Sequence, residues 1–459
     1  MSTSRSSKLH IAMFPWFAFG HFTPFLHLSN KLAERGHRVS FLLPKGAQAK
    51  LQHLNHYPNL ISFSPLLVPH VDTLPPGAET ASDVPFSLHM QLAIAFNRTQ
   101  NQVETILTTL KPHFIFFDFS YWLPALAHQL GTKAILYSVV SAAAITFIMV
   151  PAKKMEKDMT NEELIQPPSG YPSLTVGLKY KEFEIATVKI LAEDQGTGVP
   201  MYFRITSSIK ESDAVAFRTY HEVEGPYCDY LRQQYAKPAL LTGPVLTETP
   251  ETKLDEKWTK WLCNFEQGTV VYCAFGSQNI LQKDQFQELL SGFELCGQPF
   301  LVALSTPDEC ATIEEALPEE FVERVKGRGW VYGGWVPQAL ILEHPSVGCS
   351  VTHCGYGSMW ESLLSDCQIV CVPYINDQIL NARLMVEELK VAVEVEREDN
   401  GWISKQNLSE AIISVLDNNS EVAGIVKHNH AKLKEVITSE GMQERYLDTF
   451  IQSLQGLLD

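Results

Sequence analysis

Residues 9–43, LHIAMFPWFAFGHFTPFLHLSNKLAERGHRVSFLL, contain the first instance of the pattern that decides the fold. The apolar run at residues 9–14 predicts a buried strand. Thr23-Pro24 has the composition of a helix start with proline at the first helical position, and Gly36 stands where a glycine often ends a helix. The apolar run at residues 39–43 predicts the next strand. A strand, a helix and a second strand in this order predict a parallel β-α-β unit.

Short apolar runs alternate with stretches of helical period along the rest of the chain. Further strands of this first series are predicted at residues 60–63, 114–117, 134–137, 214–217 and 239–241. A second series is predicted at residues 270–273, 300–303, 329–332, 349–351, 369–372 and 392–395. The sequence therefore predicts an α/β protein with two facing, doubly wound, Rossmann-like domains. We expect residues 1–241 and 258–435 to form them, with a linker at 242–257 and a C-terminal helix at 436–459 packing back toward the first domain.

Length and composition narrow the possible functions. A chain of 459 residues is longer than one hydrophobic core usually supports, which favours two domains. Its formal net charge of -16 argues against a nucleic-acid-binding surface, which needs clustered Lys and Arg. No run of about 20 apolar residues occurs and the start of the chain makes a poor secretory leader, so we expect a cytoplasmic protein without a membrane anchor. The 9 cysteines lack the spacing of a disulfide framework and are expected to be reduced.

One segment holds most of the residues to which chemistry can be assigned. It contains Trp335, Val336, Gln338, His353, Gly355, Tyr356, Gly357, Ser358, Glu361, Asp377 and Gln378. A strand ending near His353, a turn with two glycines and a helix starting near Ser358 would aim free backbone N–H groups at a diphosphate. His353 itself can donate to a phosphate oxygen and so stabilise charge on a leaving group.

Other side chains of the same segment suit a nucleoside. Trp335 offers a flat face for uracil, and the amide of Gln338 can both donate and accept hydrogen bonds. Glu361, early in the predicted helix, can accept hydrogen bonds from both hydroxyls of a ribose. The segment therefore predicts a site for a nucleotide sugar.

These residues resemble the signature box of the plant secondary-product glycosyltransferases of family 1, whose members have the two-domain GT-B fold. The resemblance implies that UDP contacts Ser277, Trp335, Val336, Gln338, His353, Gly355, Gly357, Ser358 and Glu361. It implies donor-sugar contacts at Tyr356, Asp377, Gln378 and a first-domain serine, Ser138 or Ser141. The commonest form of the box has Trp at position 356 and Asn at position 357, so one wall of the sugar pocket and one phosphate contact should differ here.

His21 and Asp118 each follow a predicted strand of the first domain and should face the cleft between the domains. Asp118 can hold one imidazole nitrogen, which leaves the other nitrogen to take a proton from an acceptor hydroxyl. The pair matches the catalytic His and Asp of the family. We therefore expect direct displacement with inversion at the anomeric carbon, without a covalent sugar-enzyme intermediate.

Other classes of site and function have less support. No Asp-x-Asp occurs to clamp a metal diphosphate, so we expect no metal and no cofactor, the UDP-sugar being a co-substrate. No G-x-G-x-x-G follows the first predicted strand, which argues against a nicotinamide-dependent oxidoreductase. A non-catalytic UDP-sugar-binding protein is the alternative from another class, and it would have no need of His21 and Asp118.

Residues 14–17, 74–80 and 357–362 are most similar to the branch of the family that extends sugars on flavonoid glycosides. The resemblance implies an acceptor that is a glycoside of a flavonoid, an anthocyanin or a similar phenolic, with the aglycone as an alternative. We expect UDP-glucose as the donor because Gln378 often accompanies glucose in the family, and UDP-xylose and UDP-rhamnose stay open. Tyr356 offers no cation for a sugar carboxylate, which argues against UDP-glucuronic acid.

Overall fold

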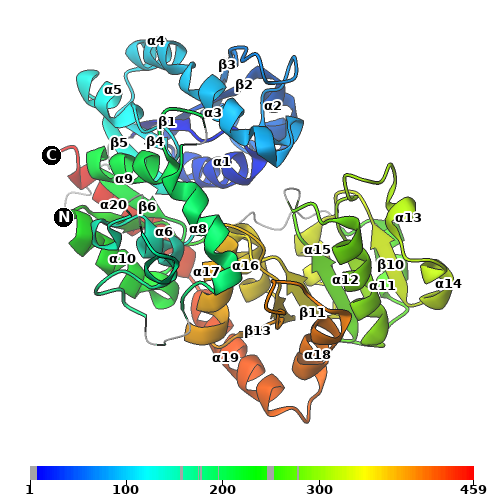
Figure 1. Cartoon of the computed structure of the whole chain (residues 1–459). Helices are drawn as coiled ribbons and strands as arrows, with labels where there is room; N and C mark the ends of the chain where they lie inside the picture. The colour runs from blue at the N-terminus through cyan, green and yellow to red at the C-terminus, as the bar shows by residue number, and fades with distance from the viewer. Residues whose placement is uncertain are drawn as a thin grey trace.

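The computed structural model describes residues 8–155, 159–173, 175, 178–194, 196–245, 253–276 and 279–459. These residues form two domains, each built on a parallel β-sheet that helices cover (Figure 1). The first sheet has 7 strands in the order β3-β2-β1-β4-β5-β6-β7, and the second has 6 in the order β10-β9-β8-β11-β12-β13. The predicted α/β fold with two doubly wound domains is confirmed.

The strands follow the apolar runs of the sequence, because a parallel strand covered on both faces is apolar along its whole length. In the first sheet they are β1 (His10–Phe14), β2 (Arg38–Pro44), β3 (Ile61–Leu66), β4 (Phe114–Phe117), β5 (Lys133–Ser138), β6 (Ala214–Phe217) and β7 (Ala239–Leu241). In the second sheet they are β8 (Val270–Ala274), β9 (Phe300–Ala303), β10 (Gly329–Tyr332), β11 (Val347–Thr352), β12 (Gln368–Cys371) and β13 (Ala392–Glu394).

Helices connect the strands and cover the sheets. Those of the first domain are α1 (Phe19–Glu34), α2 (Lys45–Leu51), α3 (His89–Asn97), α4 (Gln100–Leu110), α5 (Leu123–Gln129), α6 (Ala142–Ile148), α7 (Asn161–Ile165), α8 (Ile185–Ala192), α9 (Met201–Glu211) and α10 (His221–Tyr235). The remaining helices are α11 (Glu256–Leu262), α12 (Lys283–Leu295), α13 (Ile313–Ala316), α14 (Phe321–Arg324), α15 (Gln338–Leu342), α16 (Tyr356–Leu364), α17 (Asp377–Arg383), α18 (Lys405–Leu416), α19 (Glu421–Ile437) and α20 (Met442–Gly456).

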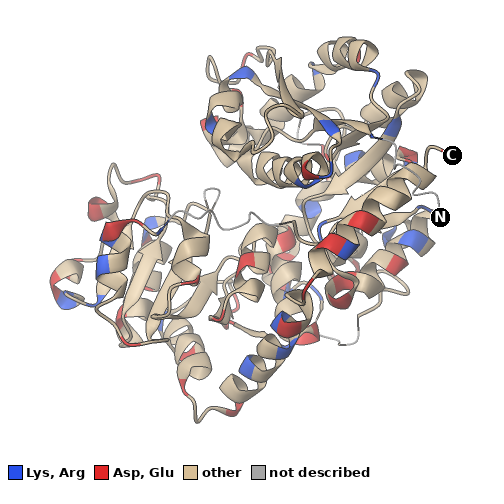
Figure 2. Cartoon of the chain, turned by 180° about the vertical axis from the view of Figure 1, so that it is seen from behind, with Lys and Arg blue, Asp and Glu red and all other residues tan. Residues whose placement is uncertain are grey.

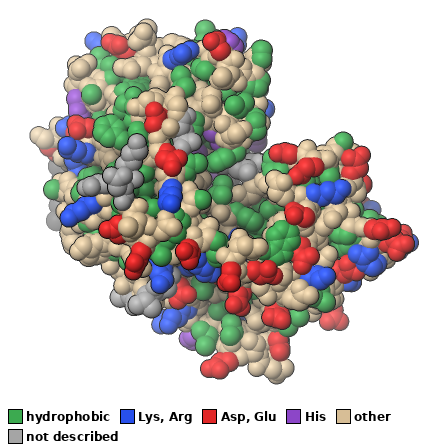
Figure 3. All heavy atoms as spheres, viewed as in Figure 1, with side chains coloured by type: hydrophobic (Ala, Val, Ile, Leu, Met, Phe, Trp, Pro, Cys, Tyr) green, Lys and Arg blue, Asp and Glu red, His purple; other side chains and the backbone are tan. Residues whose placement is uncertain are grey.

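Both sheets reverse their strand order at one point. In the first sheet this point lies between β1 and β4, where Phe14 pairs with Phe117, and in the second it lies between β8 and β11, where Ala274 pairs with Thr352. The connections that leave these neighbouring strands diverge, which opens a crevice at their carboxyl ends. The space-filling view is hollowed between the two domains (Figure 3).

Helix α1 starts earlier than the sequence predicts. Ala18 is its N-cap and Pro24 lies inside it, so the prediction of a helix start at Thr23-Pro24 is wrong. Pro24 deprives the helix of one N–H donor, but the first turn closes without it, because the N–H groups of His21 and Phe22 both donate to the Ala18 carbonyl at 2.9 Å. As a result, His21 lies on the first turn of a helix rather than in a loop.

The last helix, α20, packs on the first domain (Figure 1). The ring of Phe450 makes an edge contact with Phe116 of β4, with ring centroids 6.0 Å apart. The amide of Gln443 donates to the carbonyl of Thr242 at 2.7 Å. The chain therefore passes between the domains twice, once after β7 and once after α19.

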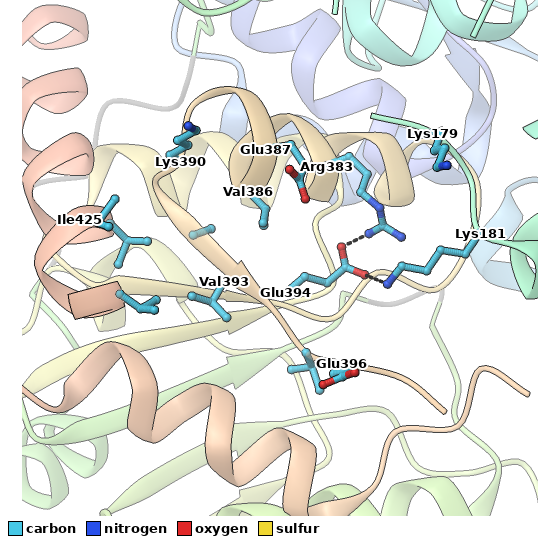
Figure 4. A pocket seen from close by; sticks show the side chains of 14 residues that line it. Lys179, Lys181, Arg383, Val386, Glu387, Lys390, Val393, Glu394, Glu396 and Ile425 are labelled. Carbon is cyan, nitrogen blue, oxygen red and sulfur yellow. Dashed lines mark hydrogen bonds and ion pairs between the residues drawn. The ribbon is translucent and has the colours of Figure 1, made fainter. Parts of the chain in front are cut away.

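An ion cluster joins the domains at the C-terminal end of α17 (Figure 4). The buried guanidinium of Arg383 lies 3.0 Å from the carboxylate of Glu184, which belongs to the first domain, and it also pairs with Glu394. Lys181 of the first domain lies 3.2 Å from the same Glu394 carboxylate. A cavity of about 600 Å³ lies beside this cluster, but none of the predicted site residues lines it.

The surface and the thiols agree with the composition. Asp and Glu outnumber Lys and Arg over the second domain (Figure 2). The 9 cysteines are free, and Cys273, Cys349 and Cys371 are buried in strands. Within the described part of the chain, no helix has both the length and the apolar content that crossing a membrane requires.

Candidate active site

The crevice side of the first domain carries His21 and Asp118. His21 lies on the first turn of α1, which follows β1, and Asp118 directly follows the neighbouring strand β4. Nδ1 of His21 lies 2.5 Å from Oδ2 of Asp118, and Oδ1 of Asp118 accepts the N–H of Trp16 at 2.8 Å. The carboxylate is therefore held on one side by the backbone and fixes the imidazole on the other.

Asp118 also determines which nitrogen of the neutral ring carries the proton. A carboxylate can only accept, so Nδ1 of His21 donates to it and Nε2 keeps its lone pair. The side chain of His21 is 28% exposed, whereas that of Asp118 is 8% exposed. An accessible lone pair backed by a shielded carboxylate is the arrangement of a general base.

In the second domain, His353 follows β11 and lies between two glycine turns. A Cβ atom on Gly355 would lie 2.5 Å from Nε2 of His353, and one on Gly276, which has a φ of +67°, would lie 3.3 Å from it. Gly276 follows β8, so the ring occupies the space between the two loops at the strand reversal. Burial lowers the pKa of His353 to about 4, although a hydrogen bond to the backbone of Ala274 opposes the shift. The ring is therefore neutral at pH 7 and donates from only one nitrogen.

Helix α16 starts immediately after His353. Its N-cap, Gly355, makes no side-chain hydrogen bond to the first turn. Cys354, before it, has a φ of +64°, a left-handed conformation that is uncommon outside glycine and turns the chain sharply from β11 into the helix. The helix consequently presents uncapped N–H groups and the positive end of its dipole at the crevice.

Side chains from three elements meet beside this helix. Gln338, the first residue of α15, donates from Nε2 to Glu361 and, at 3.3 Å, to Oγ of Ser358. Its Oε1 accepts from the hydroxyl of Tyr272 in β8 at 3.2 Å. Burial raises the pKa of Glu361, although Gln338 and Arg218 oppose the shift. The structure thus brings together Gln338, Ser358 and Glu361, which the sequence singled out for UDP.

Trp335 lies next to this cluster in the chain and is 84% exposed. Its neighbour Val336 is 8% exposed and packs in the core of the second domain. Most large aromatic side chains are stabilised by burial, and an indole left in water forgoes that stabilisation. The ring of Trp335 is therefore free to stack on the face of a base.

Asp377 begins α17 and belongs to the same crevice. Burial raises the pKa of its carboxyl from 3.8 to about 6, while the side chain of Asn381 and the charge of His21 oppose the shift. Asn381 donates to Asp377 and to the carbonyl of Cys354, both at 2.9 Å, which ties α17 to the start of α16. Asp377 is therefore held at the start of α17, close to the turn from which α16 starts.

Similarity to known proteins extends over the whole chain. Residues 245–436 match the family described as UDP-glucoronosyl and UDP-glucosyl transferase. Anthocyanidin 3-O-glucoside 2'''-O-xylosyltransferase of Arabidopsis thaliana is 51% identical over 463 aligned residues, covering 99% of this chain and 98% of that protein. UDP-glycosyltransferase 79B9 of the same plant is 52% identical over 454 residues, covering 98% of each.

The chain belongs to the plant family 1 UDP-glycosyltransferases. The family resemblance seen in the sequence and the prediction of an enzyme are thereby confirmed.

Solved structures of other glycosyltransferases share the fold of this one. A UDP-glucosyltransferase of Polygonum tinctorium superposes with a TM-score of 0.82 at 21% identity, covering 98% of this chain and 99% of that one. Arabidopsis thaliana UGT89C1 complexed with UDP-L-rhamnose superposes with a TM-score of 0.75 at 21% identity, again covering 98% and 99%. The predicted GT-B fold of the glycosyltransferase is therefore confirmed.

The two candidate serines of the glycosyltransferase both make hydrogen bonds to the nearby backbone. Ser141 is fully buried, and its oxygen caps α6 by accepting the N–H of Ala144 at 3.1 Å. Ser138 is 4% exposed and donates to the carbonyl of Val140 at 2.8 Å. Both hydroxyls thus shape the turn between β5 and α6, and contact with a donor sugar stays a prediction for either.

Tyr356 and Gln378 also make contacts that the sequence did not predict. The hydroxyl of Tyr356 lies 2.7 Å from the carboxyl of Glu224 in the first domain, so it is not available to a sugar hydroxyl. The Oε1 atom of Gln378 accepts the N–H groups of Tyr374 and Ile375 at 3.1 and 3.2 Å. That oxygen closes a turn, and contact of Gln378 with the donor sugar stays a prediction.

The remaining predicted UDP contacts of the glycosyltransferase are Gly357 and Ser277. A Cβ atom on Gly357 would meet no atom within 4 Å, so the helix start is open where the commonest box has Asn. Ser277, predicted to contact UDP, lies outside the described residues. Where the structure describes side chains, no group of three or more His, Cys, Asp or Glu could hold a metal ion.

Three further residues take part in the site without having been singled out from the sequence. Asn381 carries a weak signal, because it lies one helical turn after Asp377 on α17. Tyr272 lies inside an apolar strand and Glu224 in a helix of the other domain. No local pattern relates either of them to α15 or α16.

Proposed function

We propose that this glycosyltransferase moves a neutral sugar from UDP onto a hydroxyl of the sugar of a flavonoid glycoside or similar phenolic glycoside, inverting the anomeric carbon. The observation that carries the proposal is the His21–Asp118 pair on the crevice side of the first domain. A base supplied by one domain and a sugar-nucleotide site supplied by the other suit the transfer of a group between two bound substrates.

In this mechanism His21 is the general base. Its Nε2 takes the proton of the acceptor hydroxyl while the hydroxyl oxygen attacks the anomeric carbon. The bond from that carbon to the β-phosphate oxygen breaks in the same step, and its electron pair leaves with UDP. Asp118 stabilises the imidazolium that forms, as a carboxylate beside a histidine base does in other enzymes.

The departing UDP is stabilised from the second domain. The uncapped N–H groups of α16, together with His353 and Ser358, face the position proposed for the diphosphate. Trp335, Gln338 and Glu361 would hold the uridine by stacking and by hydrogen bonds. Because helix and side-chain donors supply the positive partial charge, we propose that transfer needs neither a metal ion nor a further cofactor.

The donor and the acceptor are proposed on similarity. A relative with 51% identity is named for xylosyl transfer to an anthocyanidin 3-O-glucoside, which supports a glycoside acceptor. We propose UDP-glucose as the donor and UDP-xylose as the second candidate, which that name favours. UDP-rhamnose and transfer to the bare aglycone are the remaining alternatives. The engaged Oε1 of Gln378 weakens the argument for glucose from that residue alone.

A matrix of substrates tests these choices. The three UDP-sugars are offered with a flavonoid and with its 3-O-glucoside, and the products are identified by mass spectrometry. We expect a second hexose on the 3-O-glucoside. Transfer to the bare flavonoid alone would contradict the glycoside acceptor, and a clear preference for xylose or rhamnose would contradict glucose. Binding of UDP-sugar without transfer to any acceptor would favour the non-catalytic alternative.

A further inference from the structure

Glu224 belongs to the first domain, but its carboxyl reaches the start of α16 in the second. The residue is fully buried, with Oε2 lying 2.7 Å from the hydroxyl of Tyr356 and Oε1 accepting the N–H of Ala143 at 3.1 Å. Tyr356 is the first residue of α16, and Ala143 is the second residue of α6. One carboxyl therefore joins two helix starts that lie on opposite sides of the domain boundary.

A bend in α10 puts the carboxyl there. Glu224 has φ of -132° and ψ of 17°, values outside the helical range, so the helix is kinked at this residue. Pro226, two residues later, has no N–H and leaves one intrahelical bond unmade, a common cause of such kinks. A carboxyl in a dry interior is costly unless it is hydrogen-bonded, and Tyr356 and Ala143 supply those bonds.

The helices that Glu224 joins also carry the candidate donor site. α6 packs against α10 and against α17, the helix that begins with Asp377. α16 begins beside His353 and presents its N–H groups at the crevice. A shift of α16 relative to α6 would therefore move the second-domain part of the donor site relative to His21.

We propose that Glu224 is a positioning residue that clamps the start of α16 to the first domain, so that bound UDP-sugar lies at the distance His21 requires. The proposal rests on the proposed function, because it needs His21 as the base and α16 as the diphosphate site. Such a clamp affects rate strongly, since a misplacement of about 1 Å between reacting groups can lower turnover about 10²-fold.

Two single variants separate loss of the clamp from its retention. Tyr356→Phe removes the hydroxyl and leaves the buried carboxyl of Glu224 short of a partner, so we expect kcat to fall about tenfold or more and Tm to fall by a few degrees. Glu224→Gln retains the clamp, because its amide can donate to the hydroxyl of Tyr356 while its oxygen still accepts from Ala143. We expect its kcat to stay within about threefold of the unaltered enzyme.

The double variant Tyr356→Phe/Glu224→Gln distinguishes positioning from folding. The side chain that Glu224→Gln introduces carries no charge, and its amide oxygen can still accept the N–H of Ala143. No charge is then buried without a partner, so the Tm should recover most of its loss. The bond between the domains stays absent, so kcat should stay about tenfold low.

Lys181→Met provides a matched control. This substitution breaks another ion pair between the same two domains. Lys181 lies 3.2 Å from Glu394, beside the C-terminal end of α17. We expect its kcat to be unchanged. The affinity for UDP alone, measured by calorimetry, should stay within about twofold in every variant, because the proposed UDP contacts lie in the second domain.

Two results would overturn the proposal: a Tyr356→Phe enzyme with unaltered kcat, or a double variant whose kcat recovers together with its Tm. Failure of the proposed function would look different, since the unaltered enzyme would then transfer no sugar to any acceptor.

Discussion

Nδ1 of His21 lies 2.5 Å from Oδ2 of Asp118, although the two residues are 97 positions apart in the chain. The carboxylate is shielded from water while the other face of the imidazole opens to the crevice. A hydrogen bond to a charged group in a shielded place is stronger than the same bond in water. The ring therefore has one preferred orientation in which to meet an acceptor hydroxyl.

Replacing His21 by Ala removes the proposed base. We expect turnover to fall about 10²-fold or more while the affinity for UDP stays nearly unchanged, measured by steady-state kinetics and calorimetry. His128→Ala is the matched control, because His128 pairs with Asp213 at 2.9 Å in the first domain and has no proposed part in transfer. An alanine variant at position 21 with near-normal turnover would remove His21 from the mechanism.

A second test compares Gly355 and Gly357, the two glycines on either side of Tyr356. A Cβ atom on Gly355 would lie 2.5 Å from Nε2 of His353, whereas one on Gly357 would meet nothing within 4 Å. Gly355→Ala should displace the imidazole and lower kcat/KM for the donor about tenfold or more, and Gly357→Ala should leave it within about twofold. Equal effects of the two substitutions would contradict the position proposed for His353.

Trp335→Ala should weaken binding of the UDP-sugar donor without lowering the stability of the fold. Because the indole is 84% exposed, the Tm should hardly change. Loss of stacking on uracil should raise the KM for UDP-sugar about tenfold, since base–aromatic stacking is worth about 1–3 kcal/mol. Leu295→Ala, at another exposed apolar residue, serves as the control for both measurements. An unchanged KM for the donor would show that Trp335 does not stack on the base.

If Asp377 contacts the donor sugar as predicted, its raised pKa, about 6, should make donor binding depend on pH. As pH falls through about 6 the carboxylate gains a proton and loses an acceptor for a sugar hydroxyl, so the KM for the donor should rise. Asp377→Asn should abolish this pH dependence. A pH profile of the donor KM that keeps the same shape in Asp377→Asn would assign the change to another group.

The same shift has a consequence for stability, with the sign fixed by linkage. The folded protein holds the proton of Asp377 more tightly than the unfolded chain, whose carboxyl has its ordinary pKa of 3.8. The resulting stabilisation is complete below about pH 4 and is lost as pH rises through about 6. Asp377→Asn should consequently raise the Tm at about pH 7.5 and leave it nearly unchanged at about pH 4.

Chelation tests the proposed independence from metal. Because helix N–H groups and His353 are proposed to stabilise the diphosphate, activity should survive exhaustive treatment with EDTA. Loss of activity that magnesium or manganese restores would contradict that account of the leaving group.

The fold could be predicted well wherever strands are covered on both faces. β4, with the sequence FIFF, is buried at all its residues, and its predicted and observed bounds coincide. The start of α1 could not be predicted from Pro24, because the preference of proline for the first helical position is a local tendency. The helix starts at Phe19 instead. There the Ala18 carbonyl accepts two N–H groups and the side chain of Phe22 is buried.

The candidate site, likewise, could be predicted from the sequence only in part. The second-domain residues lie in one segment whose spacing carries the family signature, so His353, Ser358 and Glu361 could be singled out together. The contact between Tyr356 and Glu224 joins residues 132 positions apart, and no local pattern encodes it. Its detection required the packing of one domain on the other.

The two passages of the chain between the domains, after β7 and between α19 and α20, bear on how the crevice opens. A body tethered at one point can swivel in any direction, whereas a body tethered at two points turns most easily about the line that joins them. Relative movement of the domains should therefore be a hinge rotation rather than a slide. The two walls of the crevice would then separate by rotation about the line that joins the two passages of the chain.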